Sequence, residues 1–182
     1  GLPKDRFASI KNTENWPRIV QIAWLLYDIN ESKMDEKTFL IKPEGFTIPA
    51  SATQIHGITT ETALNSGAVL EITLKELAVA LKQSDYVIAH NFDFDSKVLG
   101  AEFIRAKIQY DLFKKHHICT MNSSADFCKI RQQRGYKWPN LSELHYKLFR
   151  QPFVEAHDAM IDVAACAKCF FELKKRKIIA IQ

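Results

Sequence analysis

The chain has 182 residues, of which 47% are hydrophobic and 25% are charged, and its formal net charge is +4. This composition indicates one folded domain with a core and excludes collagen-like, low-complexity and disordered chains. The longest apolar runs fall well short of the ~20 residues that a membrane-spanning helix needs, and no secretory signal opens the sequence. A mildly basic charge permits a nucleic-acid partner without requiring one.

The first half of the chain predicts a β hairpin followed by helices. Residues 19–27 form a bounded apolar run rich in β-branched and aromatic side chains, which is typical of a strand. Residues 38–42 are expected to pair with it after turn residues at 30–33. Residues 43–65 look irregular apart from a short helix at 50–56 that stops at Gly57. Apolar residues then recur at helical spacing over 70–81.

The second half alternates a strand with helices. Residues 86–89 are apolar throughout, which predicts a strand buried on both faces of a sheet. Helices are expected over 94–106, over 122–131, up to Phe149 with Asn140 or Ser142 as the cap, and from Asp158 onward. This order indicates an α/β domain with a mixed sheet.

The four cysteines favour a reduced, cytoplasmic protein, because this chain is long and lacks a secretory signal. Cys166 and Cys169 have the C-x-x-C spacing, but no second pair of that kind exists. They also lie within an apolar helical run. We therefore interpret them as core residues and not as a zinc or redox site.

A first polar cluster covers residues 90–95, His-Asn-Phe-Asp-Phe-Asp, directly after the strand at 86–89. Ligands of open α/β sheets bind outside the carboxyl ends of strands, so this position is a candidate site. Either Asp93 or Asp95 could direct a carboxylate there. The alternative is that one of them caps the next helix while the other is solvated.

A second cluster contains His157 and Asp162. Five residues of helix turn about 500°, so these side chains converge only if His157 precedes the helix and Asp158 caps it. Asp162 then lies one turn into the helix, where the helix dipole favours a carboxylate. A carboxylate in a largely apolar helix, without Arg or Lys at hand, suggests a bound cation. The alternative is a capping Asp with one core histidine.

Together the two clusters favour phosphodiester hydrolysis. Hard carboxylate oxygens suit Mg²⁺ or Mn²⁺, and two such ions about 3.5–4 Å apart assist displacement at phosphorus. A histidine near the attacking water can act as general base near neutral pH.

These motifs resemble the DEDD family of 3′–5′ exonucleases, in the branch that includes the proofreading epsilon subunit of bacterial DNA polymerase III and ribonuclease T. Residues 90–95 match H-N-x-x-F-D, residues 157–162 match H-x4-D, and residues 56–59 match H-G-I-T. The resemblance implies that Asp95 and Asp162 are metal ligands and that His157 is the general base. It implies that His56 and Asn91 contact substrate.

The resemblance also implies a fold, cofactors and partners. The fold is a ribonuclease H-like mixed β-sheet flanked by helices, and the cofactors are two Mg²⁺ or Mn²⁺ ions. The substrate is the 3′ end of single-stranded DNA, and the products are nucleoside 5′-monophosphates. RNA is an alternative substrate, and a DNA polymerase subunit is a further partner that the resemblance allows. No membrane partner is expected.

The family's first motif, D-x-E-T-T-G, has no match in this sequence, although residues 1–3 resemble those that normally follow it. That motif supplies two of four acidic ligands and lies on the first, central strand of the sheet. We therefore expect a single exonuclease domain over residues 1–182 that is N-terminally incomplete and lacks this strand. Its absence leaves buried backbone edges unpaired unless another segment fills the slot. The alternative function is a catalytically inactive nucleic-acid-binding or interaction module of the same fold.

Overall fold

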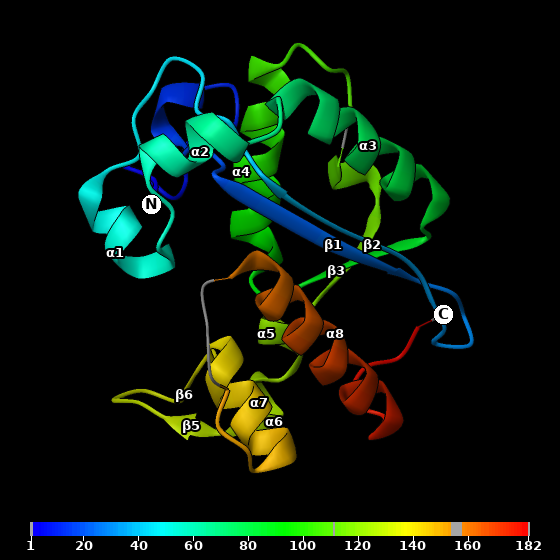
Figure 1. Cartoon of the computed structure of the whole chain (residues 1–182). Helices are drawn as coiled ribbons and strands as arrows, with labels where there is room; N and C mark the ends of the chain where they lie inside the picture. Colours follow the sequence, from blue (N-terminus) through cyan, green and yellow to red (C-terminus); the bar gives the residue numbers. More distant parts are fainter. Residues whose placement is uncertain (1, 111, 154–157, 182) are drawn as a thin grey trace.

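The computed structural model describes residues 2–110, 112–153 and 158–181 (Figure 1). Within these residues the strands form three separate two-stranded sheets, which pair β1 with β2, β3 with β4, and β5 with β6. Short 3₁₀ turns lie at Thr13–Asn15 and Leu112–Lys114. No helix in the described part of the chain is both long and apolar enough to cross a membrane.

The predicted hairpin is confirmed, with a longer second strand than expected. β1 (Gln21–Tyr27) pairs antiparallel with β2 (Lys33–Leu40), from Gln21 opposite Leu40 to Tyr27 opposite Lys33. The turn is tighter than the sequence suggests. The Asp28 side chain accepts hydrogen bonds from two backbone N–H groups of the turn, at 2.9 and 2.8 Å, so β2 begins at Lys33.

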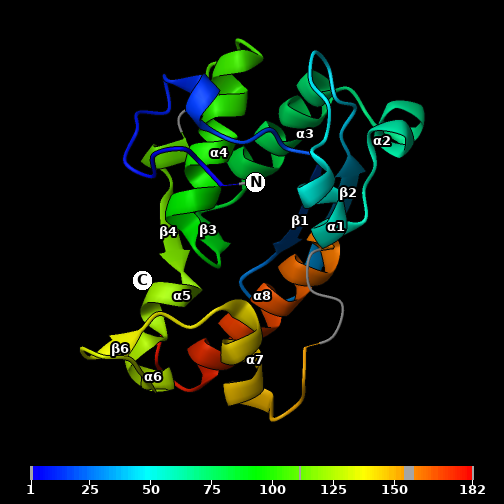
Figure 2. The same cartoon turned by 90° about the vertical axis from the view of Figure 1, so that its left-hand side faces the viewer.

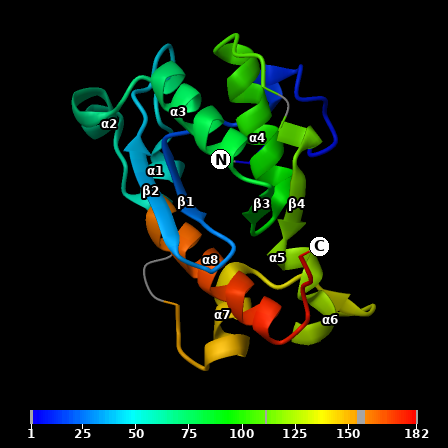
Figure 3. The same cartoon turned by 90° about the vertical axis from the view of Figure 1, so that its right-hand side faces the viewer.

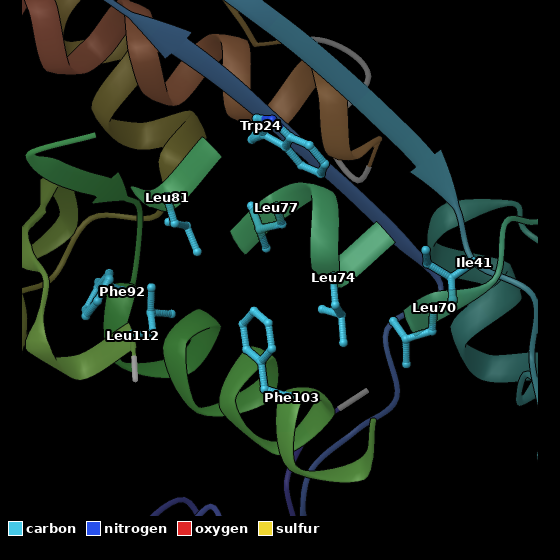
Figure 4. Packing of buried hydrophobic residues seen from close by; sticks show 9 residues of the cluster. All are labelled: Trp24, Ile41, Leu70, Leu74, Leu77, Leu81, Phe92, Phe103 and Leu112. Atoms are coloured by element: carbon cyan, nitrogen blue, oxygen red, sulfur yellow. The ribbon is translucent and has the colours of Figure 1, made fainter. Parts of the chain in front are cut away.

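The helices that follow the hairpin agree with the sequence except at one point. α1 (Ala50–His56) ends at Gly57, whose φ of 74° suits glycine. α2 (Thr60–Ser66) lies where we expected irregular chain. Only Ala63 of α2 is buried, so this helix has no apolar face that a pattern could detect. α3 (Leu70–Gln83) is confirmed, and its leucines pack in the core beside Trp24 and Phe103 (Figure 4).

The second sheet joins β3 (Tyr86–Ala89) in parallel to β4 (His116–Cys119). The sequence did not predict β4, because its first two residues are exposed histidines and the strand lacks an apolar pattern. α4 (Phe92–Arg105) connects the two strands and begins two residues earlier than expected. β3 is half-buried along its whole length, which corrects the prediction that it is fully buried.

The helix predicted over 122–131 is wrong. The chain instead forms two single-turn helices, α5 (Thr120–Ser123) and α6 (Ala125–Cys128), followed by a hairpin of β5 (Ile130–Arg131) and β6 (Tyr136–Lys137). The break falls at Ser124, whose buried hydroxyl donates to the carbonyl of Thr120 at 2.7 Å. Such a side-chain bond competes with continuous helix.

The last two helices confirm the predicted caps. α7 (Leu141–Phe149) is capped by Asn140 in a capping box with Glu143, and α8 (Ala159–Lys175) is capped by Asp158. Cys169 packs between these helices, and burial raises the pKa of both Cys166 and Cys169 to about 12. Both are buried free thiols, as expected of core residues.

Candidate active site

A large hollow separates the first two sheets. Helix α8 packs against both β1 and β3, while the two strands stand apart from each other (Figure 3). Between them lies a cavity of about 1380 Å³, lined by every residue of β1 and of β3 and by parts of α4 and α8. Interiors of folded proteins contain few voids larger than a water molecule. This cavity lies between two strand edges that no strand pairs within the described residues, where the family resemblance implies a central strand.

One residue that lines the hollow also carries an unpaired polar atom. The indole Nε1 of Trp24 is buried and has no hydrogen-bond partner within the described residues. Trp24 is on β1 and lines the hollow. A buried donor without a partner is uncommon in a finished core.

Asp95 faces this hollow from the first turn of α4. The residue is exposed to the hollow, yet many protein atoms lie close around its carboxyl group. Burial, and secondarily the negative charge of Asp162, raise the pKa of Asp95 to about 7. Asp93 lies two residues earlier, with 73% of its side chain exposed and an ion pair to Lys97 at 2.8 Å. Of the two candidate aspartates, the structure therefore brings Asp95 to the hollow.

Asp162 lies in the first turn of α8 and also lines the hollow. The start of α8 is held from β1 by Gln21. Its Nε2 donates to Asp158 at 2.9 Å, and its Oε1 accepts from the N–H of Ala159 at 3.1 Å. The carboxylate of Asp158 also accepts from the backbone N–H groups of residues 160 and 161. The hydrogen bond from Gln21 is the main cause that lowers the pKa of Asp158.

Gln21 is a site residue that the sequence analysis missed. It fixes the direction of the first turn of α8, and with it the position of Asp162. The sequence carries no signal for this role, because an amide at the start of a strand is compatible with many contacts.

His90 connects the site to the segment before α7. Its Nε2 donates to the carbonyl of Pro139, and its Nδ1 contacts the hydroxyl of Thr120, both at 3.0 Å. Burial is the main cause that lowers the pKa of His90, with the bond to Pro139 opposing it. His90 is therefore a neutral, hydrogen-bonded residue that positions its neighbours.

The remaining predicted residues are not all brought to the hollow. Asn91 precedes α4 with a left-handed φ of 74°, and its carbonyl accepts from the N–H groups of Phe94 and Asp95. His56 ends α1, and its Nδ1 accepts from the N–H of Ile58 at 3.1 Å. Neither Asn91 nor His56 is among the described residues that line the hollow. His157 lies outside the described residues.

The two carboxylates fit part of a metal site. Asp95 and Asp162 supply hard oxygen atoms, and they are close enough for one charge to alter the pKa of the other. The described residues contain no group of three or more His, Cys, Asp or Glu side chains that could hold a metal ion. Two carboxylates suit one Mg²⁺ or Mn²⁺ that keeps several waters, but a two-ion site needs further ligands.

Comparisons with known proteins agree with this architecture. The sequence model of a family described as exonuclease matches residues 10–170. No curated protein sequence matches the chain. The solved structures that match include *E. coli* exonuclease I in complex with a dT13 oligonucleotide. That structure has a TM-score of 0.73 and 20% identity, over 89% of this chain and 38% of that chain.

Two further structures of *E. coli* exonuclease I give similar values. The complex with a dA16 oligonucleotide has a TM-score of 0.69 and 18% identity, over 88% of this chain and 38% of that chain. The zinc-bound form of the complex with single-stranded DNA has a TM-score of 0.69 and 22% identity, over 88% of this chain and 37% of that chain. The chain thus spans less than two fifths of these proteins, and the likeness confirms the ribonuclease H-like α/β fold.

The matched region of the family model extends over both polar clusters, at residues 90–95 and 157–162. This confirms the resemblance to DEDD-type exonucleases, and the chain belongs to the exonuclease family.

Proposed function

We propose that this chain is a catalytic domain of a metal-dependent 3′–5′ exonuclease that acts on single-stranded DNA and releases nucleoside 5′-monophosphates. The observation that carries the proposal is the pairing of Asp95 and Asp162. They lie in the first turns of two different helices and line one hollow. The oligonucleotides bound to *E. coli* exonuclease I support single-stranded DNA as the substrate class.

Each candidate residue has a role in this proposal. Asp95 and Asp162 hold Mg²⁺ or Mn²⁺, which when bound polarises the scissile phosphate and favours ionisation of the attacking water. His157 takes the proton of that water, as a histidine near neutral pH can. Asn91 and His56 contact the terminal nucleotide.

The complete site requires an additional strand in the hollow. The cavity-facing edges of β1 and β3 present backbone N–H and C=O groups that no other strand pairs within the described residues. An extended segment satisfies such edges, whereas a compact ligand does not. We propose that this strand carries the further carboxylates that a two-ion site needs.

A second function follows from the incomplete ligand set. The described residues supply two carboxylates and no third ligand to the site. The alternative function is therefore a module that binds nucleic acid without catalysis. It differs from the first proposal in one measurable respect, because it binds DNA without metal-stimulated shortening.

The test uses a 5′-labelled single-stranded oligonucleotide with Mg²⁺ or Mn²⁺. Two proteins are compared: the chain itself, and a form extended before Leu2 by an apolar strand that contains an Asp-x-Glu pair. D162N is prepared in both, and matched RNA and 3′-blocked DNA serve as substrate controls. We expect a ladder of shortened products from the extended form alone, and none from its D162N variant.

Other outcomes contradict specific parts of the proposal. A ladder from the chain itself shows that the additional strand is not required. No ladder from either form, with DNA binding retained, favours the binding module. Shortening of 3′-blocked DNA contradicts the 3′–5′ direction.

A further inference from the structure

A basic hairpin stands out among the surfaces that the proposed chemistry does not use. We define it as residues 129–138, which contain four Lys or Arg and no Asp or Glu. β5 and β6 pair within it, with Ile130 opposite Lys137 and Arg131 opposite Tyr136. Two large aromatic side chains are exposed on it, Tyr136 at 44% and Trp138 at 62%.

The basic hairpin is held in a defined shape. The Gln132 side chain donates to the carbonyls of Arg134 and Tyr136 at 3.3 and 3.2 Å, and its backbone N–H donates to Gly135 at 3.2 Å. At its base, Lys137 forms an ion pair with Glu143 of α7 at 2.6 Å. Such a turn presents its side chains with little loss of conformational freedom on binding.

Its remaining cations are available to a partner. Lys129, Arg131 and Arg134 are exposed, and none of them forms an ion pair with another residue in the described part of the chain. Along this segment of ten residues the three cations come first and the two exposed aromatic rings follow, at positions 136 and 138. A polyanion that also carries flat apolar rings is complementary to such a surface, and single-stranded nucleic acid has both properties.

The basic hairpin is connected directly to the candidate active site. Trp138 precedes Pro139, whose carbonyl accepts the hydrogen bond from His90. The next residue, Asn140, caps α7 and lines the same hollow as Asp95 and Asp162. The hairpin projects outward from the part of the molecule formed by α6 and α7 (Figure 1).

We propose that the basic hairpin binds the single strand on the 5′ side of its terminal nucleotide. Bases stack on Trp138 and Tyr136, and phosphates contact Arg131 and Arg134. The proposal rests on the proposed function, since it names the surface that holds the rest of the same substrate. In this proposal the hairpin contacts nucleotides of the substrate that do not take part in the reaction.

Fluorescence anisotropy of a labelled dT oligonucleotide in EDTA tests the proposal without cleavage. W138A and Y136A are each expected to raise Kd at least about fivefold, given the usual loss when a stacking ring is removed. W138F retains most of the affinity and W138L does not, because stacking needs an aromatic ring. R131A/R134A is expected to reduce the slope of log K against log salt by about 1.4, or about 0.7 for each phosphate contact.

Two control variants separate a local contact from a general effect. K11A/K82A removes the same charge from exposed positions elsewhere, and F7A removes an exposed ring. Both are expected to bind DNA like the unchanged protein. Equal losses in K11A/K82A and R131A/R134A overturn the proposal, because net charge alone then explains the binding.

The two proposals can fail separately. If the extended form shortens DNA while W138A and R131A/R134A bind as tightly as the unchanged protein, only the hairpin proposal is overturned. If the hairpin variants lose affinity as expected while no form shortens DNA, the hairpin proposal stands and the exonuclease proposal fails. If the unchanged protein binds no oligonucleotide, the hairpin proposal is overturned together with the substrate class.

Discussion

Two carboxylates at opposite ends of helix α4 have contrasting surroundings. Glu102, near the C-terminal end, is fully buried and lies 3.0 Å from Arg18 and 3.1 Å from Arg105. It also accepts the N–H of Ile19 at 3.0 Å. Asp95, seven residues earlier, forms no ion pair with any residue that the structure describes, and the nearby charge that acts on it is that of Asp162.

The difference separates a structural charge from one that is left for a ligand. A buried carboxylate is costly unless a cation or hydrogen bonds compensate it. The fold places two arginines beside Glu102, and the bonds that Glu102 accepts from Arg18 and from the N–H of Ile19 attach this segment to α4. Within the described residues it supplies no arginine or lysine to Asp95, which lines the hollow and is exposed there to a ligand. Both carboxylates lie on α4, so their different roles follow from the residues around each of them and not from the helix.

The largest effect on stability is expected for Glu102. E102Q removes the negative charge and leaves two partly buried arginines without a compensating partner. We expect unfolding free energy to fall by roughly 3 kcal/mol, at the low end for broken buried pairs because Arg18 is 29% exposed. Urea unfolding followed by tryptophan fluorescence measures it. E71Q, which breaks the exposed pair of α3 with Lys75, is the control and should leave the midpoint unchanged. Equal midpoints for E102Q and the unchanged protein contradict the structural role.

The converse effect is expected for Asp95, where activity falls and the fold persists. In the form extended by the additional strand, D95N removes a metal ligand, and we expect the rate of DNA shortening to drop at least about 100-fold. D93N is the matched control, because Asp93 is exposed and paired with Lys97. It should retain activity within about twofold. A comparable loss in D93N contradicts the assignment of the metal ligand to Asp95.

The raised pKa of Asp95 predicts that the free energy of unfolding changes with pH in the opposite direction to the change that a paired carboxylate causes. Because the pKa is raised to about 7, the folded state binds more protons than the unfolded state between about pH 4 and 7. Stability therefore falls as pH rises through this window. In EDTA at pH 8, D95N should be more stable than the unchanged protein by about 1–2 kcal/mol, after discounting for water in the hollow. The gain should vanish near pH 3, and a gain that is independent of pH contradicts this cause.

The sequence predicts the elements that carry strong periodic or apolar patterns. The strand at 19–27, the helix at 70–81 and the cap at Asp158 agree with the structure, because each rests on local spacing or on a capping residue. β4 and α2 were missed for the opposite reason. Their exposed residues carry no apolar pattern, and β4 becomes a strand only through its pairing with β3.

Of the candidate site residues, the structure brings Asp95 and Asp162 to one hollow, and the sequence did not predict their surroundings. Both aspartates lie in the first turn of a helix, where the sequence also placed them. The choice of Asp95 over Asp93 came from the family resemblance, and the structure adds that Asp95 lines the hollow whereas Asp93 pairs with Lys97. The roles of Gln21 and Arg18 depend on contacts between residues far apart in sequence, which no local pattern contains.

The smallest effect is expected at the start of α8, where Asp158 orients the turn that carries Asp162. D158A removes the cap and the hydrogen bond from Gln21, so unfolding free energy should fall by about 1 kcal/mol. D158N keeps a capping oxygen and should recover most of this.

The stability of the D158A variant should depend on pH in the opposite way to that of D95N. The pKa of Asp158 is lowered, so its contribution is present above the unfolded value of about 4 and is lost as pH falls below it. Urea unfolding at pH 3 and pH 8 should therefore show a smaller D158A deficit at pH 3 than at pH 8, where D95N shows its gain. These opposite changes at one pH distinguish a carboxylate that the fold satisfies from one that it leaves for a cation. A D158A deficit that persists undiminished at pH 3 contradicts the charged cap.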